Sequence, residues 1–211
     1  EDIRVKGIDQ LDIEDVNITR DFGYVFKLIG SAIKTDKGID LWVEPCLIDH
    51  HHSFANVHNE YNAIMIKGDA ADDVMFYGKG AGQLPAASAV VSDIIDLSKY
   101  IANGTAGVVQ NVVYSKKKIV KFLPHGDSKS DYYLRFSVVN RPGVLSKISG
   151  ILGEHGVSIA SLYQDDRNKD KKVSIIITTH RTKSENLSDA IKEIDKLSIV
   201  KAKTVKYRIE E

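Results

Sequence analysis

Two glycine-containing loops carry the clearest chemistry in this sequence. The first, Gly78-Lys79-Gly80-Ala81-Gly82, lies between an apolar run that ends at Tyr77 and a helix-like run that begins near Pro85. Glycines at such a junction let the backbone approach a ligand closely, and the free N–H groups of a helix N-terminus favour an anion or a carbonyl oxygen. Because the loop lacks the full G-x-G-x-x-G spacing of a dinucleotide fingerprint, a merely tight turn stays open as the alternative.

The second loop, Asn140-Arg141-Pro142-Gly143, ends a strand-like run and opens a helix-like one. Pro142 presets the first helical turn, and Gly143 permits close approach of a ligand. The unpaired N–H groups at this helix start suit a carboxylate, and Asn140 can hydrogen-bond to either a charge or a hydroxyl group. The loop is therefore a candidate site for a small polar ligand.

Four histidines, His50, His51, His52 and His58, raise the question of a metal site. Neighbouring side chains of an extended chain alternate in direction, so three adjacent histidines cannot all reach one ion. No pair of His or Glu residues with i, i+4 spacing supports them. We therefore expect no metal site.

The candidate acid and base groups favour structural roles. Glu44 lies beside Pro45 in a strand-like run, and we interpret Glu44 and Asp49 as structural rather than as a catalytic pair. Lys27 and Lys34 lie in or next to strand-like runs and are expected to face solvent. Reduction of a carbonyl needs a donor near the developing alkoxide, and nothing in the chain clearly supplies one.

Composition excludes several classes of partner. The 211 residues hold 29 Lys and Arg against 29 Asp and Glu, so no net field attracts nucleic acid or an anionic membrane. The triplet at 116–118 is interpreted as solvated surface. No run of 18 apolar residues predicts a membrane span, and the single cysteine, Cys46, is expected in the core of a cytoplasmic protein. The opening without methionine suggests a piece cut from a longer protein.

The first half of the sequence predicts an antiparallel sheet with helices. Apolar runs of strand type, separated by polar turns, predict a meander of about four strands. Helical spacing predicts a short helix, with Asp12 as its N-cap, and a long helix that ends at Asn103-Gly104. The expected strands are 24–33, 38–48, 61–67 and 73–77, and the expected helices are 13–22 and 85–102.

The second half predicts a ferredoxin-like domain. Its expected order is strand, helix, strand, strand, helix, strand within about 80 residues, which is the split βαβ arrangement. A concentrated turn signal at 124–130 marks the expected boundary, so the predicted domains are residues 1–125 and 131–211. The predicted fold class is α+β, with a βαββαβ second domain.

The first loop and its surroundings resemble the homoserine dehydrogenase family. The string from Tyr77 to Asp93 is similar to that family's Y-G-x-G-A-G followed by x-L-P-x-A-S-A-V-V-x-D, although Lys79 stands where proline is common. The resemblance covers about the first 110 residues and implies a truncated substrate-binding and dimerisation domain. It also implies that Gly80, Ala81 and Gly82 lie against the nicotinamide end of NADP or NAD.

The same resemblance implies that much of the enzyme is missing. In the family, the general-acid lysine, the substrate carboxylates and the Rossmann domain lie upstream, so no catalytic residue is expected in this chain. The implied reaction interconverts L-homoserine and L-aspartate 4-semialdehyde, in threonine, methionine and isoleucine biosynthesis. The alternative is a stand-alone amino-acid sensor that uses a degenerate dehydrogenase domain for dimerisation.

The second loop resembles the strand-loop-helix element of ACT domains, and the run from Leu152 to Leu162 continues the resemblance. It implies that an amino acid, with threonine as the expected feedback effector, binds between the loop and the start of the second strand. An ACT-like fold kept only for association stays open. A homodimer or tetramer is expected. The implied effector residues are Asn140, Arg141, Pro142, Gly143, Ser158, Ile159 and Ala160.

Overall fold

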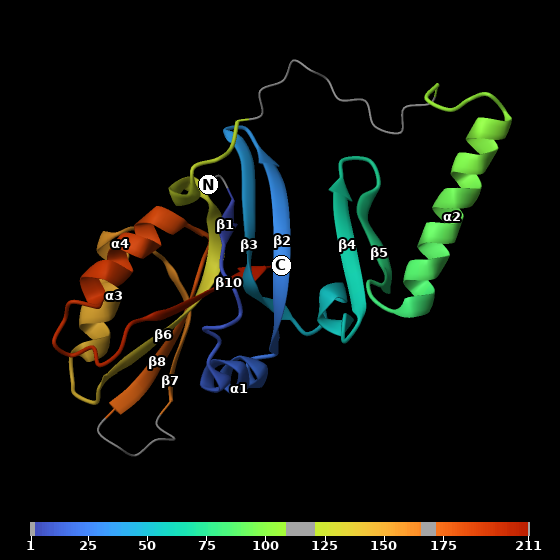
Figure 1. Cartoon of the computed structure of the whole chain (residues 1–211). Coiled ribbons are helices and arrows are strands. Elements are labelled where there is room, and N and C mark those ends of the chain that lie inside the picture. The colour runs from blue at the N-terminus through green and yellow to red at the C-terminus, as the bar shows by residue number, and fades with distance from the viewer. Residues whose placement is uncertain (1–2, 109–120, 166–171, 211) are drawn as a thin grey trace. The chain divides into compact units, whose positions relative to one another are not determined.

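The computed structural model describes residues 3–108, 121–165 and 172–210 (Figure 1). The chain divides into two compact units, one made of Glu1–Ala55 with Val120–Glu211 and the other of Asn56–Ile119. The helical elements are α1 (Ile13–Asp21), η1 (Ser53–Asn56), α2 (Gln83–Ala102), η2 (His125–Asp127), α3 (Val144–Glu154) and α4 (Ser184–Ile194). The strands are β1 (Arg4–Val5), β2 (Tyr24–Thr35), β3 (Gly38–Asp49), β4 (Tyr61–Gly68), β5 (Asp72–Lys79), β6 (Lys129–Val139), β7 (Ile159–Asp165), β8 (Lys172–Thr179), β9 (Thr182–Lys183) and β10 (Val205–Glu210).

The first unit is built on one eight-stranded sheet. Strands β10, β6, β8 and β7 lie in that order and, with α3 and α4, form the predicted βαββαβ arrangement. The sheet continues past β10, because β3 pairs with it in parallel and places Cys46 opposite Arg208. Strand β2 pairs with β3 as an antiparallel hairpin, and β1 pairs with β3 in parallel. The two predicted domains therefore share one sheet.

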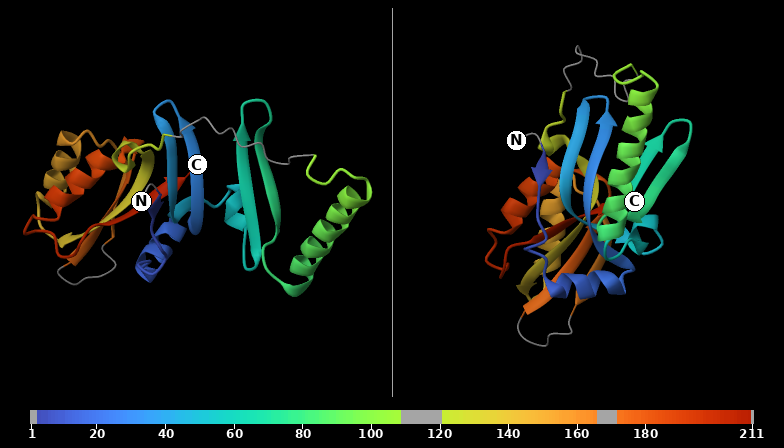
Figure 2. Two further views of the ribbon diagram at one scale, coloured as in Figure 1. Left: turned by 45° about the horizontal axis from the view of Figure 1, so that its top comes forward. Right: turned by 45° about the vertical axis from the view of Figure 1, so that its right-hand side comes forward.

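Helices cover both faces of this sheet, with α1 on the side opposite to α3 and α4 (Figure 2). Successive residues of β6 alternate between the faces. Leu134 and Phe136 join the core beneath α3 and α4, whereas Tyr133 packs with Ile18 of α1. Each fully buried apolar side chain of this kind contributes about 1.5–3 kcal/mol relative to exposure. Each face of the sheet thus carries a hydrophobic core.

Helix α1 begins where its sequence predicts and ends one residue before the predicted end, at Asp21. Asp12 is the N-cap, and its carboxylate accepts a hydrogen bond from the backbone N–H of Glu14 at 2.9 Å. Gly23, with φ of 81°, provides the left-handed turn after the helix. This turn leads directly into β2, so α1 is fixed to the hairpin that it covers.

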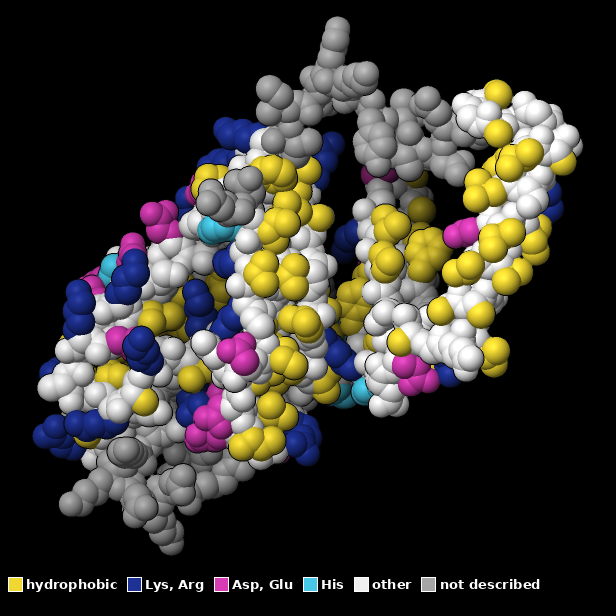
Figure 3. Space-filling view, viewed as in Figure 1, with side chains coloured by type: hydrophobic (Ala, Val, Ile, Leu, Met, Phe, Trp, Pro, Cys, Tyr) yellow, Lys and Arg dark blue, Asp and Glu magenta, His cyan; other side chains and the backbone are white. Residues whose placement is uncertain are grey.

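The second unit consists of the β4–β5 hairpin and α2. Within the described residues, the apolar side chains of α2 are unburied: Ile94 is 57 % exposed and Ile101 is 70 % exposed. Figure 3 shows apolar side chains along α2 and on the hairpin. An exposed apolar surface of this kind is typical of an interaction site. No helix within the described residues has the length and hydropathy that a bilayer crossing requires.

The predicted four-stranded meander is wrong in one respect. Both hairpins form, but β4 and β5 make a sheet of their own, while β2 and β3 join β10. Local alternation predicts hairpins and does not specify which edge a hairpin later joins. The predicted domain boundary near 125–131 stays a prediction. The compact units divide the chain at other places, since the second unit is Asn56–Ile119.

Candidate functional site

The first glycine loop connects β5 to α2. Gly82 is the N-cap of α2, with φ of 126°, a conformation that residues with a Cβ rarely adopt. No side chain caps the helix, so the first-turn N–H groups lack a side-chain acceptor. The loop therefore has the backbone chemistry predicted for approach to a polar ligand group.

Gly80 is required for a steric reason. Its N–H donates to the carbonyl of Glu60 at 2.8 Å, which ties the loop to the start of β4. A Cβ at this position would collide with the side chain of Asn62. By contrast, a Cβ on Gly78 would meet no atom within 4 Å. Gly80 and Gly82 thus fix the loop, whereas Gly78 does not.

The second loop has a similar local design. Gly143 is the N-cap of α3, with φ of 85° and no side-chain cap. Its carbonyl accepts from Lys147 N–H at 3.1 Å, so the helix begins directly after it. Asn140, Arg141 and Pro142 are exposed. The first-turn N–H groups of α3 therefore lack a side-chain acceptor.

Strand register separates this loop from the segment expected to face it. Val139, at the end of β6, lies opposite the start of β8 at residue 172, whereas Ile159 lies opposite Thr179 at the end of β8. Seven residues of strand correspond to about 23 Å. Ser158 and Ala160 are exposed at that far end, and Ile159 packs partly on the core. One chain therefore does not bring the seven residues together, and a shared site needs two copies.

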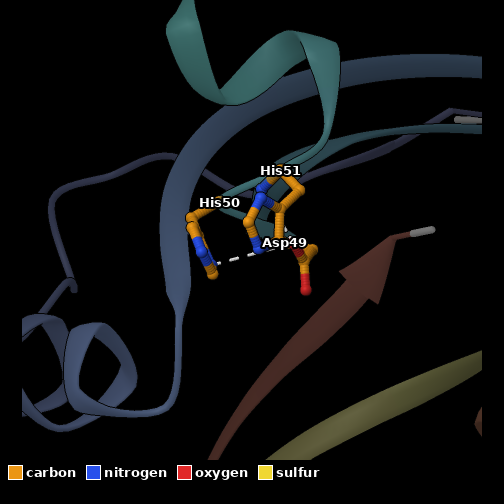
Figure 4. A group of neighbouring side chains, drawn as sticks. All are labelled: Asp49, His50 and His51. Atoms are coloured by element: carbon orange, nitrogen blue, oxygen red, sulfur yellow. Dashed lines mark hydrogen bonds and ion pairs between the residues drawn. The ribbon is translucent and has the colours of Figure 1, made fainter.

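The histidine cluster lies in a turn rather than in an extended chain, so the premise of the sequence argument is wrong there. The ligand atoms of Asp49, His50 and His51 lie within 4.8 Å of one another (Figure 4). Two of these groups already have partners, because His50 Nδ1 lies 2.9 Å from the Gly23 carbonyl and Asp49 Oδ1 accepts from His51 N–H. His52 Nδ1 accepts from Phe54 N–H instead. The expectation of no metal site stays a prediction.

Comparison with known proteins identifies both parts of the chain. Residues 1–95 match the model of the family described as "Homoserine dehydrogenase", and residues 132–198 match that of the ACT domain. The whole chain is 35 % identical to the homoserine dehydrogenase of Bacillus subtilis (strain 168), and 98 % of it is 36 % identical to that of Neisseria gonorrhoeae. The chain is therefore similar along its full length to homoserine dehydrogenases, and its last part to ACT domains.

A solved homoserine dehydrogenase from Thiobacillus denitrificans has the same fold, with a TM-score of 0.89 and 36 % identity over 99 % of this chain. The chain spans 48 % of that structure and 48 % of each of the two curated relatives. It thus corresponds to a C-terminal portion of homoserine dehydrogenases. The α+β fold with a ferredoxin-like ACT domain, predicted from the sequence, is confirmed.

A buried ion cluster links the homoserine dehydrogenase region to the ACT domain. Arg135 of β6 is 6 % exposed, and its guanidinium donates to Asp15 of α1, which is fully buried. Tyr133 donates its hydroxyl to the same carboxylate at 3.0 Å. Burial and the nearby Asp15 charge raise the pKa of Tyr133 above its ordinary value. Carboxylate oxygens of Glu14 and Asp12 also lie 2.8 and 3.3 Å from the nitrogens of the Arg135 guanidinium.

A second cluster crosses the β3–β10 junction. Arg208 is 2 % exposed and donates to Glu44 at 2.7 Å, and Arg4 donates to the same carboxylate at 2.8 Å. These two ion pairs support the structural interpretation of Glu44, which stays a prediction. Lys27 is half-buried rather than fully solvent-facing, and burial lowers its pKa. Cys46 is buried as predicted, which raises the pKa of its thiol.

Proposed function

We propose that this chain is the C-terminal part of a homoserine dehydrogenase that interconverts L-homoserine and L-aspartate 4-semialdehyde with NADP or NAD. The observation that carries the proposal is the β5-to-α2 loop, whose glycine geometry fits close ligand approach, in a chain related over its full length to homoserine dehydrogenases. The substrate contacts and the general acid belong to the upstream half in this proposal.

The loop fits a nicotinamide cofactor in its chemistry. Gly80 and Gly82 leave no side chain between the backbone and a flat ring, and Ala81 between them adds only a methyl group. The uncapped first turn of α2 offers N–H donors to a carboxamide oxygen. The cofactor, when bound, supplies or accepts the hydride. The role of Gly80, Ala81 and Gly82 is to orient its reactive end and exclude water.

The choice between NAD and NADP belongs to the missing half. In Rossmann domains, the residue near the ribose 2′ position makes this distinction. We assign no residue of this chain to it, and none to acid–base catalysis.

The ACT domain has the proposed role of sensing an amino acid, with threonine as the effector. The N-terminus of α3 suits the carboxylate, and Asn140 suits a hydroxyl group. Because Ser158–Ala160 lie at the other end of β8, the proposed site needs a second copy to supply them. Feedback requires threonine to bind one conformational or assembly state better than another, since equal affinity shifts nothing.

Association of copies is part of the proposal. The exposed apolar face of α2 and the hairpin suits burial against a second chain, giving a homodimer or tetramer.

The test uses the protein together with its upstream half. Gly82→Val should lower kcat/KM about 100-fold, because a displaced loop misplaces the reacting atoms. The matched control is Gly78→Ala in the same loop, where a Cβ meets open space, and its kcat/KM should stay unchanged. Equal activity of the Gly82 variant and the wild type would contradict the assignment of the loop. A folded protein that binds an amino acid without any turnover would favour the sensor alternative.

A further inference from the structure

The first unit contains a cavity that neither glycine loop reaches. It is open to solvent and has a volume of about 500 Å³ between α4, the η2 turn, β1 and β10. The η2 turn and α4 lie side by side near the N-terminus in Figure 1. Cavities that bind small molecules have volumes of about 300–1,000 Å³. The lining residues that matter here are Arg4, Asp127, Glu185, Ser188, Asp189 and Lys206.

Two cations line one side of this cavity without enough negative charge beside them. Arg4 shares the carboxylate of Glu44 with Arg208. The ammonium of Lys206 has a long hydrogen bond, 3.4 Å, to Ser188 Oγ. Among the described residues, no carboxylate lies within 4.0 Å of the Lys206 ammonium, which lies 5.4 Å from the centre of the Tyr132 ring. This side of the cavity therefore carries excess positive charge.

The pKa of Lys206 agrees with an excess of positive charge on this side of the cavity. Its pKa is lowered to about 8, first by burial and then by repulsion from Arg4, with Glu44 opposing the shift. Lys6 and Arg208 repel it further. An anion in the cavity would relieve the repulsion and hold Lys206 in its charged form.

Helix α4 and the η2 turn contribute three carboxylates and one cation, Lys192, to the lining. Among the described residues, Glu185 at the start of α4 has no ion-pair partner, whereas Asp189 pairs with Lys192 at 2.8 Å and Asp127 with Lys183 at 2.7 Å. Glu185, the carboxylate without an ion pair, would repel a simple anion, and Arg4 and Lys206 would repel a simple cation. A ligand with both charges avoids either penalty.

We propose that this cavity binds a small zwitterion of the amino-acid type, with its carboxylate towards Arg4 and Lys206 and its ammonium towards Glu185. This site differs from the proposed ACT effector site, because none of its lining residues belongs to the Asn140–Gly143 loop or to Ser158–Ala160. It does not depend on the dehydrogenase assignment.

Calorimetric titration of the 211-residue chain with each of the twenty proteinogenic amino acids and L-homoserine, at millimolar concentration, tests the proposal. At least one should bind. Lys206→Met and Glu185→Gln should each weaken that binding about tenfold or more, because each removes a charge-assisted contact. Butyrate and butylamine, which carry one charge each, should bind more weakly than the amino acid.

Controls separate this site from the loop site. Gly143→Val changes only the loop and should leave the cavity signal intact, and Lys147→Met removes an exposed charge outside the cavity. Lys206→Met should fold, since it removes a desolvated charge, and a thermal unfolding curve checks this. The proposal is overturned if no amino acid binds, or if Lys206→Met and Glu185→Gln bind as the wild type does. It is also overturned if Gly143→Val abolishes all binding, or if butyrate alone binds as tightly.

Discussion

The buried contact between α1 and the ACT sheet allows a quantitative prediction. Asp15→Ala removes a fully buried carboxylate that accepts from both Arg135 and Tyr133. Removing one partner of a buried pair costs about 3–5 kcal/mol. Glu14 and Asp12 still reach Arg135, so we expect the lower end, about 3 kcal/mol. With a urea dependence of about 2 kcal/mol per molar, the unfolding midpoint should fall by about 1.5 M.

Urea unfolding followed by tryptophan fluorescence measures this directly, because the chain has one tryptophan, Trp42, which is 1 % exposed in the same unit. The control is Glu14→Gln, whose half-exposed ion pair should contribute less than about 1 kcal/mol. The double variant Asp15→Ala with Arg135→Met should be more stable than Asp15→Ala alone, because it also removes the buried guanidinium that has lost its buried partner. A loss below about 1 kcal/mol for Asp15→Ala would refute the reasoning.

Three further predictions concern charge, assembly and the effector. Folding lowers the pKa of Lys206 to about 8, so the unfolded chain binds more protons than the folded chain between about pH 8 and 10. The free energy of unfolding, relative to that of Lys206→Met, should therefore rise with pH over that window. A difference in unfolding free energy that does not change with pH would contradict the burial of this charge. Light scattering should find the chain as a dimer or larger, and Ile94→Lys with Ile101→Lys should shift it towards the monomer; a wild-type monomer at micromolar concentration would count against the apolar face as an interface. Calorimetry should detect threonine binding to the wild type and none to Gly143→Val. If threonine, serine, methionine, isoleucine and lysine all give no binding heat, association remains as the role of the ACT domain.

The elements of this fold could be predicted because their signals are local. Asp12 and Gly23 mark the ends of α1, and helical spacing marks α2. The parallel pairing of β3 with β10 could not be predicted in this way. It joins segments about 160 residues apart, and neither strand carries a local mark of its partner.

The ion clusters were missed for a related reason. Charged residues are almost never fully buried without a partner, so Arg135 within the apolar run of β6 is a signal that a carboxylate lies nearby. The sequence does not say which of the 29 acidic residues it is. The glycine loops were found because their function depends on backbone conformation, and positive φ values at Gly82 and Gly143 are what glycine at a helix start indicates.

The placement of Ser158–Ala160 shows a limit of motif reasoning. The structure has a loop at 140–143, as the motif indicates, and the second strand of the domain begins at Ile159. Their separation along β8 follows from the register, which the motif does not contain.

The most direct test of the central claim is a steady-state assay of the protein with its upstream half, following homoserine-dependent reduction of NADP or NAD. We expect turnover of about 1 per second or more, and none from the 211-residue chain alone. A folded protein that includes the upstream half and shows no homoserine-dependent reduction of either cofactor would contradict the account.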